Sequence, residues 1–183
     1  ISAYALKLEE GTPLWQENPE LPDEDTQAEM YLQTVRRLEQ AGWHQYEISN
    51  FARPGFHSRH NSRYWDLSDY LGFGCAAHSF YGGKRFSFTS DIDAYIKGMN
   101  GQNPIVEEAD ELAYTDRVGE FVMLALRTCD GIDENAFYSR WGRDFAPFAR
   151  RLQPYIATGH VLCEGGRWHL TPEGFLVSNI IIG

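Results

Sequence analysis

The chain has 183 residues, of which 43% are hydrophobic and 23% charged, and its formal net charge is −10. These values are typical of a globular protein with one or two domains and a sizeable core. They argue against nucleic acid as a partner, because phosphate binding requires clustered cations, and no apolar run approaches the roughly 20 residues of a membrane span.

The thiol content is sparse. Cys75, Cys129 and Cys163 are widely spaced, and no two of them have CxxC spacing. An odd, scattered set argues against a disulfide scaffold and indicates a reducing, cytoplasmic location, and it predicts no zinc or iron–sulfur site. The chain opens on a strand-like run without a leader or an initiator methionine, so we expect a segment of a longer protein.

The first fifty residues have the pattern strand, helix, strand. Residues 1–8 are apolar on both faces, as in a buried strand. Residues 23–41 begin with acids and continue with apolar residues at helical spacing up to Gly42, and residues 43–51 predict a second strand. Such a unit has parallel strands and places ligands at their carboxyl ends.

The second predicted strand leads into a basic stretch rich in aromatic residues. Between residues 53 and 85 there are five Lys/Arg and two Asp/Glu, against the negative charge of the whole chain. Cations beside ring faces indicate a site for a flat anionic ligand, and the alternative is a loop with ordinary surface arginines. Ser58 is expected to cap a short helix in which His60 and Tyr64 share one face.

Small residues dominate the next segment. Residues 71–80 predict a third strand, in which Gly72 and Gly74 mark places where another group approaches the backbone. The alternative is a bulge packed against a neighbouring helix. Residues 84–89 predict an outer strand, and residues 91–99 a short helix with Ile92, Tyr95 and Ile96 turned inward.

Residues 100–104 are short, polar and rich in breakers, so they predict a boundary between a domain at 1–100 and another at 105–183. The second domain shows three helical patterns, a hairpin signal within residues 160–170 and a last helix that Thr171 caps, which is a winged-helix-like arrangement. This shape suggests DNA binding. The domain has seven Lys/Arg and twelve Asp/Glu, however, so a docking or covering module is favoured.

Three short motifs support a resemblance that extends over essentially the whole chain. They read Tyr-Glu-Ile-Ser-Asn-Phe-Ala at 46–52, His-Asn-x-Arg-Tyr-Trp at 60–65 and Tyr-Leu-Gly-Phe-Gly-x-Ala-Ala-His-Ser at 70–79. Further agreements are Ser2, Tyr4, Leu6, Glu9, Gly11, Thr12, Asp116 and Arg117. Together they resemble the C-terminal half of the oxygen-independent coproporphyrinogen III oxidase-like radical SAM family, and within it the HemW-type heme chaperones.

The resemblance implies an α/β fold, with part of a radical SAM (βα) barrel at residues 1–100 and a mostly helical, winged-helix-like domain at 105–183. Members of the family hold a [4Fe–4S] cluster through a CxxxCxxC motif and bind S-adenosylmethionine. This sequence lacks that motif, so we expect that the chain by itself neither binds the cluster nor cleaves S-adenosylmethionine. The motif alignment places five residues at the S-adenosylmethionine wall: Lys7, Gly72, Gly74, Ala77 and His78.

The resemblance also implies heme binding at the His-Asn-x-Arg-Tyr-Trp motif, with His60 as the ligand of the heme iron. A neutral imidazole is a common axial ligand. Tyr64 and Trp65 are suited to cover the macrocycle, and Arg63, together with Arg59, to meet the propionates. The alternative role for His60 is a structural hydrogen bond to a backbone carbonyl.

The function that the resemblance implies is a cytoplasmic carrier that binds heme and transfers it to recipient hemoproteins. One alternative is a true oxygen-independent coproporphyrinogen III oxidase, a radical SAM decarboxylase of porphyrin biosynthesis, and another is a protein-docking module without a ligand. The His60 motif favours the carrier over the enzyme. Peripheral membrane association and a homodimer are further alternatives that the sequence leaves open.

Overall fold

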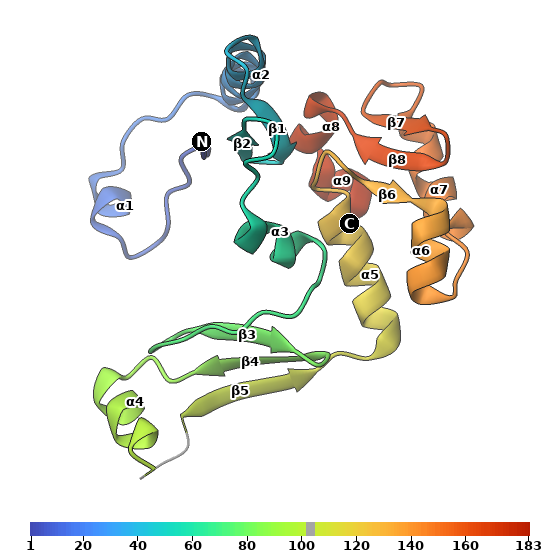
Figure 1. Ribbon diagram of the computed structural model, residues 1–183. Coiled ribbons are helices and arrows are strands. Elements are labelled where there is room, and N and C mark those ends of the chain that lie inside the picture. Colours follow the sequence, from blue (N-terminus) through green and yellow to red (C-terminus); the bar gives the residue numbers. More distant parts are fainter. Residues whose placement is uncertain (102–104) are drawn as a thin grey trace. The chain divides into compact units, whose positions relative to one another are not determined.

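The computed structural model describes residues 1–101 and 105–183, and it shows a mixed α/β chain (Figure 1). Two compact units are present: one combines residues 1–57 with 126–183, and the other comprises residues 58–125. These units differ from the domains predicted at 1–100 and 105–183, which remain a prediction. Residues 102–104 of the predicted boundary lie outside the described residues.

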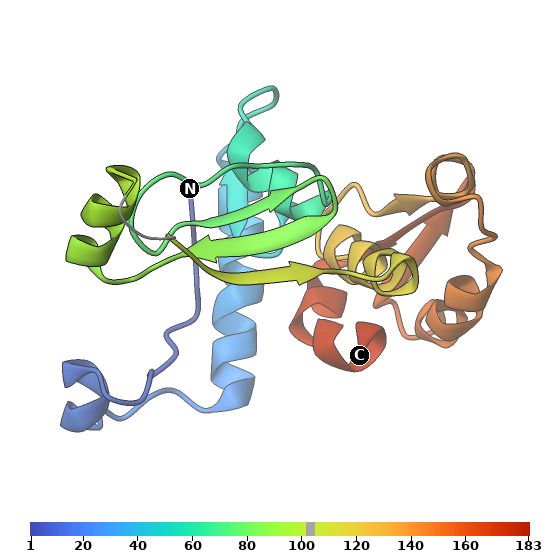
Figure 2. The same cartoon turned by 90° about the horizontal axis from the view of Figure 1, so that it is seen from below.

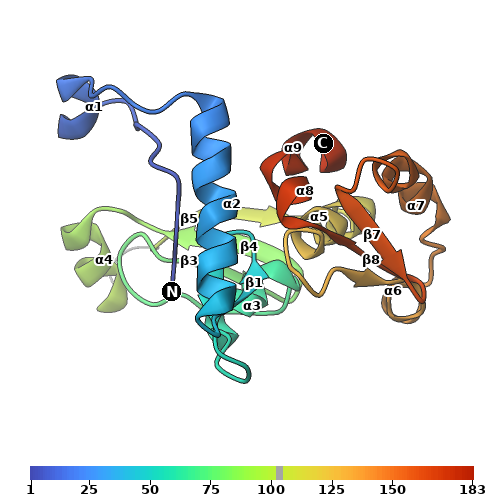
Figure 3. The same cartoon turned by 90° about the horizontal axis from the view of Figure 1, so that it is seen from above.

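The N-terminal part of the first unit contains the predicted helix. The elements are α1 (Pro13–Glu17), α2 (Glu24–Gln40), β1 (His44–Glu47) and β2 (Asn50–Ala52). The Asp23 side chain caps α2 by accepting the Thr26 backbone N–H at 2.7 Å, and Val35 is buried under the helix. The long straight form of α2 is clearest in Figure 3.

The predicted parallel strand–helix–strand unit is wrong. β1 and β2 form an antiparallel hairpin, because the Glu47 carboxylate accepts the Ser49 N–H at 3.1 Å and also accepts from the Asn50 amide, which closes a turn. Ser2 in turn forms an antiparallel bridge to Asn50. The side chains of residues 4–7 are exposed, so residues 1–8 do not form the buried strand that was expected.

The C-terminal part of the first unit contains the predicted hairpin and all but the first of the helices that the sequence predicted after residue 105. Its elements are β6 (Ile132–Asp133), α6 (Glu134–Trp141), α7 (Ala146–Leu152), the 3-10 turn η1 (Gln153–Tyr155), β7 (Val161–Glu164), β8 (Arg167–Leu170), α8 (Pro172–Leu176) and α9 (Ser178–Ile182). The strands form an antiparallel sheet in the order β6-β8-β7, of which β6 was not predicted. Phe137, Phe145 and Trp168 are among the buried aromatic residues of its core.

Backbone hydrogen bonds join the two sequence-distant parts of this unit. The Ile48 N–H donates to the Arg127 carbonyl at 3.0 Å, and the Cys129 N–H donates to the Tyr46 carbonyl at 3.1 Å. The β1–β2 hairpin is therefore held from both sides, by residues 1–3 and by the segment after residue 125.

The second unit is built on an antiparallel sheet in the order β3-β4-β5 (Figure 2). Its elements are α3 (Arg59–Trp65), β3 (His78–Tyr81), β4 (Lys84–Phe88), α4 (Ile92–Met99), β5 (Val106–Glu111) and α5 (Tyr114–Ala125). β4 is therefore the central strand and not an outer one. Within residues 1–101 and 105–183, no helix has both the length and the apolar composition that crossing a membrane requires.

Two details of this unit differ from the sequence prediction. The strand expected at 71–80 begins only at His78, because Gly74 (φ +109°) and Ala76 (φ +59°) have left-handed backbone conformations that interrupt an extended chain. In α4, Ile92 and Ile96 were expected to face inward, but they are 66% and 54% exposed.

Candidate functional site

A short capped helix positions the histidine that the sequence singled out. The Ser58 hydroxyl accepts the Asn61 N–H at 3.2 Å at the start of α3, as predicted. The Ser62 hydroxyl donates to the Ser58 carbonyl at 2.9 Å and reinforces the first turn. His60 and Tyr64 are consequently one helical turn apart on the same face of α3.

The His60 imidazole lies at the surface and is paired with Tyr64. The Tyr64 hydroxyl is 2.7 Å from His60 Nε2, and the two rings meet edge to face with their centroids 5.1 Å apart. On its other side, Tyr64 packs edge to face against Tyr70, with the centroids 4.6 Å apart. Tyr64 is 40% exposed, so the pair is open to solvent.

The other residues of the motif surround this pair. The Arg63 guanidinium donates to the Asp69 carbonyl at 3.0 Å, which fixes its position while leaving the side chain exposed. Arg59 is exposed in the first turn of α3, and Trp65 is half-buried at its end. The structure thus gathers an exposed imidazole, two aromatic rings and two cationic side chains on one short helix.

The glycine-rich loop packs closely against its own strand. A Cβ on Gly72 would lie 2.3 Å from the His78 carbonyl oxygen, so only glycine fits there. The Gly72 N–H donates to the Ser79 hydroxyl at 3.0 Å, and the Gly74 N–H donates to the Tyr95 hydroxyl at 3.2 Å. The group that approaches the Gly72 backbone closely is therefore the chain's own backbone at His78, and not the neighbouring helix of the alternative prediction.

The remaining residues of the predicted S-adenosylmethionine wall belong to both compact units. The Ala77 carbonyl accepts the Phe88 N–H at 3.0 Å, and His78 is exposed on β3 opposite Ser87. Lys7 belongs to the other compact unit, where its ammonium group lies 2.8 Å from the Glu9 carboxylate. The hydrogen bond and the charge of Glu9 raise the pKa of this exposed lysine.

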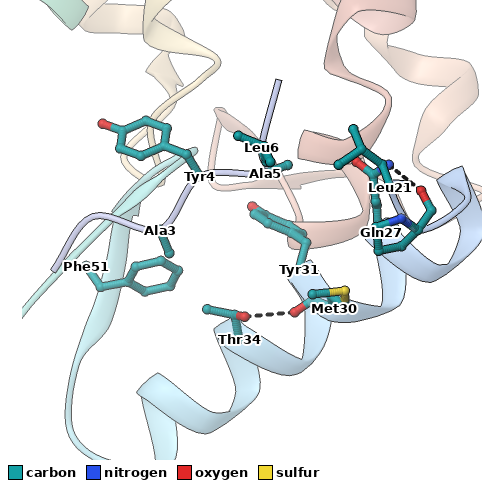
Figure 4. A pocket seen from close by; sticks show the side chains of 11 residues that line it. Ala3, Tyr4, Ala5, Leu6, Leu21, Gln27, Met30, Tyr31, Thr34 and Phe51 are labelled. Atoms are coloured by element: carbon teal, nitrogen blue, oxygen red, sulfur yellow. Dashed lines mark hydrogen bonds between the residues drawn. The ribbon is translucent and has the colours of Figure 1, made fainter. Parts of the chain in front are cut away.

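The sequence did not point to a cavity of about 340 Å³ in the first unit. Figure 4 shows its mainly apolar lining, which comes from residues 3–6, from α2 and from Phe51. At its edge, Tyr31 donates to the Ile48 carbonyl at 3.2 Å and accepts from the Gln45 amide at 2.7 Å. Burial raises the pKa of Tyr31 to about 12.

The sequence did not single out the buried carboxylate of Glu47 either. Glu47 is only 1% exposed, and burial raises its pKa, although its hydrogen bonds with Asn50 and Ser49 act in the opposite direction. Its place in the motif at residues 46–52 is the sequence signal that marks it. The network continues from Asn50 to the hydroxyls of Ser2 and Tyr4, so it connects the N-terminal segment to the hairpin.

The donor set of the described residues does not suit an iron–sulfur cluster. Cys75 donates to the Thr89 and Ser90 carbonyls, Cys163 lies on β7, and burial raises the pKa of Cys129 to about 12. Over the part of the chain that the structure describes, no three His, Cys, Asp or Glu side chains form a group that could hold a metal ion.

Relatives of this chain are known. Residues 112–177 match the HemN C-terminal domain family. The heme chaperone HemW of Bacillus subtilis (strain 168) is 32% identical over 164 residues, which make up 89% of this chain and 43% of that protein. The heme chaperone HemW of Mycobacterium tuberculosis (strain H37Rv) is 32% identical over 186 residues, which make up 100% of this chain and 46% of that protein.

A solved structure shows the same fold. Coproporphyrinogen III oxidase (HemN) from Escherichia coli, described as a radical SAM enzyme, matches with a TM-score of 0.67 and 21% identity over 88% of this chain and 41% of that one. The chain spans less than half the length of these relatives. Residues 112–177 therefore carry a HemN C-terminal domain, and the chain is homologous to part of the HemW heme chaperones.

Proposed function

We propose that this chain is the heme-binding part of a HemW-type carrier that delivers heme to hemoproteins. The observation that carries the proposal is the exposed His60 imidazole, which α3 presents beside Tyr64 and two arginines. This donor set suits heme, because imidazole binds the iron, aromatic rings cover the macrocycle and guanidinium groups pair with propionates. The heme is the cargo of the protein and not a resident cofactor.

The likeness to the HemW relatives supports a carrier more than an oxidase. The matched relatives are named heme chaperones, whereas the oxidase match, at 21% identity, supports only the fold. The described cysteines offer no cluster site, so the proposal uses no radical step on this chain. The scattered free thiols support a reducing compartment, and we place the carrier in the cytoplasm.

The same proposal includes the domain architecture and a second ligand, S-adenosylmethionine. We place residues 105–183 in a winged-helix-like domain, which the three helices and the hairpin support. The motif alignment supports Gly72, Gly74, Ala77 and His78, together with Lys7, as residues near S-adenosylmethionine. The exposed positions of His78 and Lys7 leave both side chains accessible to a ligand.

The test is a hemin titration of the purified protein followed by Soret absorbance. His60→Ala is expected to weaken heme binding at least about tenfold, because it removes the only protein bond to the iron that we propose. His44→Ala is the matched control, since it removes another exposed imidazole that belongs to neither proposed binding site and should leave the affinity unchanged. An unchanged affinity for His60→Ala would show that the ligand assignment is wrong.

A further inference from the structure

We propose that the Tyr64 hydroxyl latches His60: it occupies Nε2 in the heme-free protein and must release this nitrogen before the iron can bind. The inference rests on the proposed function and adds a control element to the same site. The distance of 2.7 Å between Tyr64 Oη and His60 Nε2 is that of a good hydrogen bond. Heme binding at Nε2 therefore competes with an interaction that already exists.

The competition holds whichever group donates. If the Tyr64 hydroxyl donates, it uses the Nε2 lone pair that the iron needs, and the imidazole proton resides on Nδ1. If the imidazole donates, Nε2 carries a proton and has no lone pair to offer. In both cases iron coordination through Nε2 requires that the hydrogen bond opens, whereas coordination through Nδ1 would leave it intact.

Contacts with the rest of the unit hold the Tyr64 ring, and with it the hydroxyl oxygen, in place. The Tyr64 ring packs edge to face on Tyr70 with centroids 4.6 Å apart. Tyr70 is anchored to β3, because it exchanges two backbone hydrogen bonds with Phe80, at 2.7 and 3.0 Å. Burial raises the pKa of Tyr70, which agrees with its place between Tyr64 and the sheet. The ring therefore stays against the sheet while the contact with His60 opens.

The latch predicts that removal of the hydroxyl strengthens heme binding. The apparent affinity of a site is its intrinsic affinity reduced by the fraction of molecules in the open state. A hydrogen bond of ordinary net strength shifts that fraction by roughly two- to tenfold. Tyr64→Phe keeps the ring that packs on Tyr70 and should therefore tighten hemin binding by roughly this factor.

The experiment compares hemin titrations of four purified variants with the wild type: Tyr64→Phe, His60→Ala, the double variant and Tyr81→Phe. Tyr81→Phe is the matched control, because it removes the hydroxyl of an exposed tyrosine on β3 of the same unit that takes no part in the latch, so it should leave the affinity unchanged. In the His60→Ala background, Tyr64→Phe should have no effect, since the latch acts only through His60. Circular dichroism verifies that each variant is folded.

A second readout does not depend on heme. In the heme-free wild type, ¹⁵N NMR of the His60 ring should show a hydrogen-bonded Nε2, and Tyr64→Phe should change the shift of that nitrogen. Unchanged or weaker hemin binding by Tyr64→Phe, together with weaker binding by His60→Ala, would overturn the latch and leave the proposed function intact. Unchanged binding by His60→Ala would instead contradict the proposed function itself.

Discussion

Glu47 shows how one side chain shapes this molecule. It is 1% exposed and joins the Ser49 backbone to the Asn50 amide, and Asn50 continues the network to Tyr4. A carboxylate in such a place closes a turn and ties down the N-terminal segment, but its charge is poorly solvated. Burial consequently raises its pKa.

This raised pKa predicts a distinctive pH dependence of stability. The folded protein keeps the Glu47 proton to a higher pH than the unfolded chain does, so the stabilisation by Glu47 is fully present below the ordinary value of 4.5 and declines as the pH rises through the folded pKa. The free energy of unfolding of the wild type minus that of Glu47→Gln should therefore fall as the pH rises above 4.5 and through the raised pKa of the folded protein. Urea unfolding at several pH values measures this difference.

Glu39→Gln is the control for the pH experiment, because Glu39 is an exposed carboxylate on α2 in the same compact unit. Its removal changes the net charge by the same amount. If the two variants show the same pH profile, the effect of Glu47→Gln comes from net charge and not from its burial.

At the level of single residues, the sequence predicted relations along a helix better than pairings across space. The four-residue separation of His60 and Tyr64 predicts a shared helical face, and the structure confirms it. The hydrogen bond between the two side chains depends on rotamers that Tyr70 helps to select, and no local pattern encodes that contact. The polar side chains of Gln45 and Glu47 are buried, because each finds a hydrogen-bond partner there. The Gln45 amide donates to the Ile48 carbonyl, and the Glu47 carboxylate accepts the Ser49 N–H.

At the level of elements, helix signals were reliable because they are local. The Thr171 side chain caps α8, as the sequence predicted, and α6 has equally local signals, since the Asp133 side chain caps it and Gly142 ends it in a left-handed conformation. The strands were harder to predict, because pairing involves distant residues. β6 has only two residues and exists because Ile132 pairs with Trp168, a partner that lies far along the chain.

The packing of α8 gives a prediction about an element. A Cβ on Gly174 would lie 2.0 Å from the His160 carbonyl oxygen, so this helix can approach the chain before β7 only with glycine. Gly174→Ala should lower the free energy of unfolding by about 3 kcal/mol through overpacking. Thermal unfolding followed by far-ultraviolet circular dichroism measures the loss.

Gly119→Ala is the matched control for Gly174→Ala. Gly119 also lies within a helix, but a Cβ added there would lie in open space. It should raise the free energy of unfolding by about 0.5 to 1 kcal/mol, as expected for alanine in an exposed helix. Equal effects of the two substitutions would mean that helix propensity, and not the contact with His160, determines the result at Gly174.

At the level of the whole molecule, the compact units do not follow the order of the sequence. The first unit unites residues 1–57 with 126–183, and the β1–β2 hairpin forms backbone hydrogen bonds to Arg127 and Cys129. The sequence predicted two consecutive domains, because composition marks a polar break but does not reveal which distant segments pair. The family match at residues 112–177 likewise begins in one unit and ends in the other.

This organisation predicts which parts of the chain lose stability together. Val161 is completely buried on β7, and Val161→Ala should lower the stability of the first unit by about 2 kcal/mol. Because units of this kind open cooperatively, hydrogen exchange measured by mass spectrometry should accelerate in α2, β1 and β2 although they are distant in sequence, while β3–β5 keep their protection. Leu162→Ala, at a neighbouring position that is 39% exposed, should change little. Faster exchange in β3–β5 to the same degree would show that the whole chain opens as a single cooperative unit.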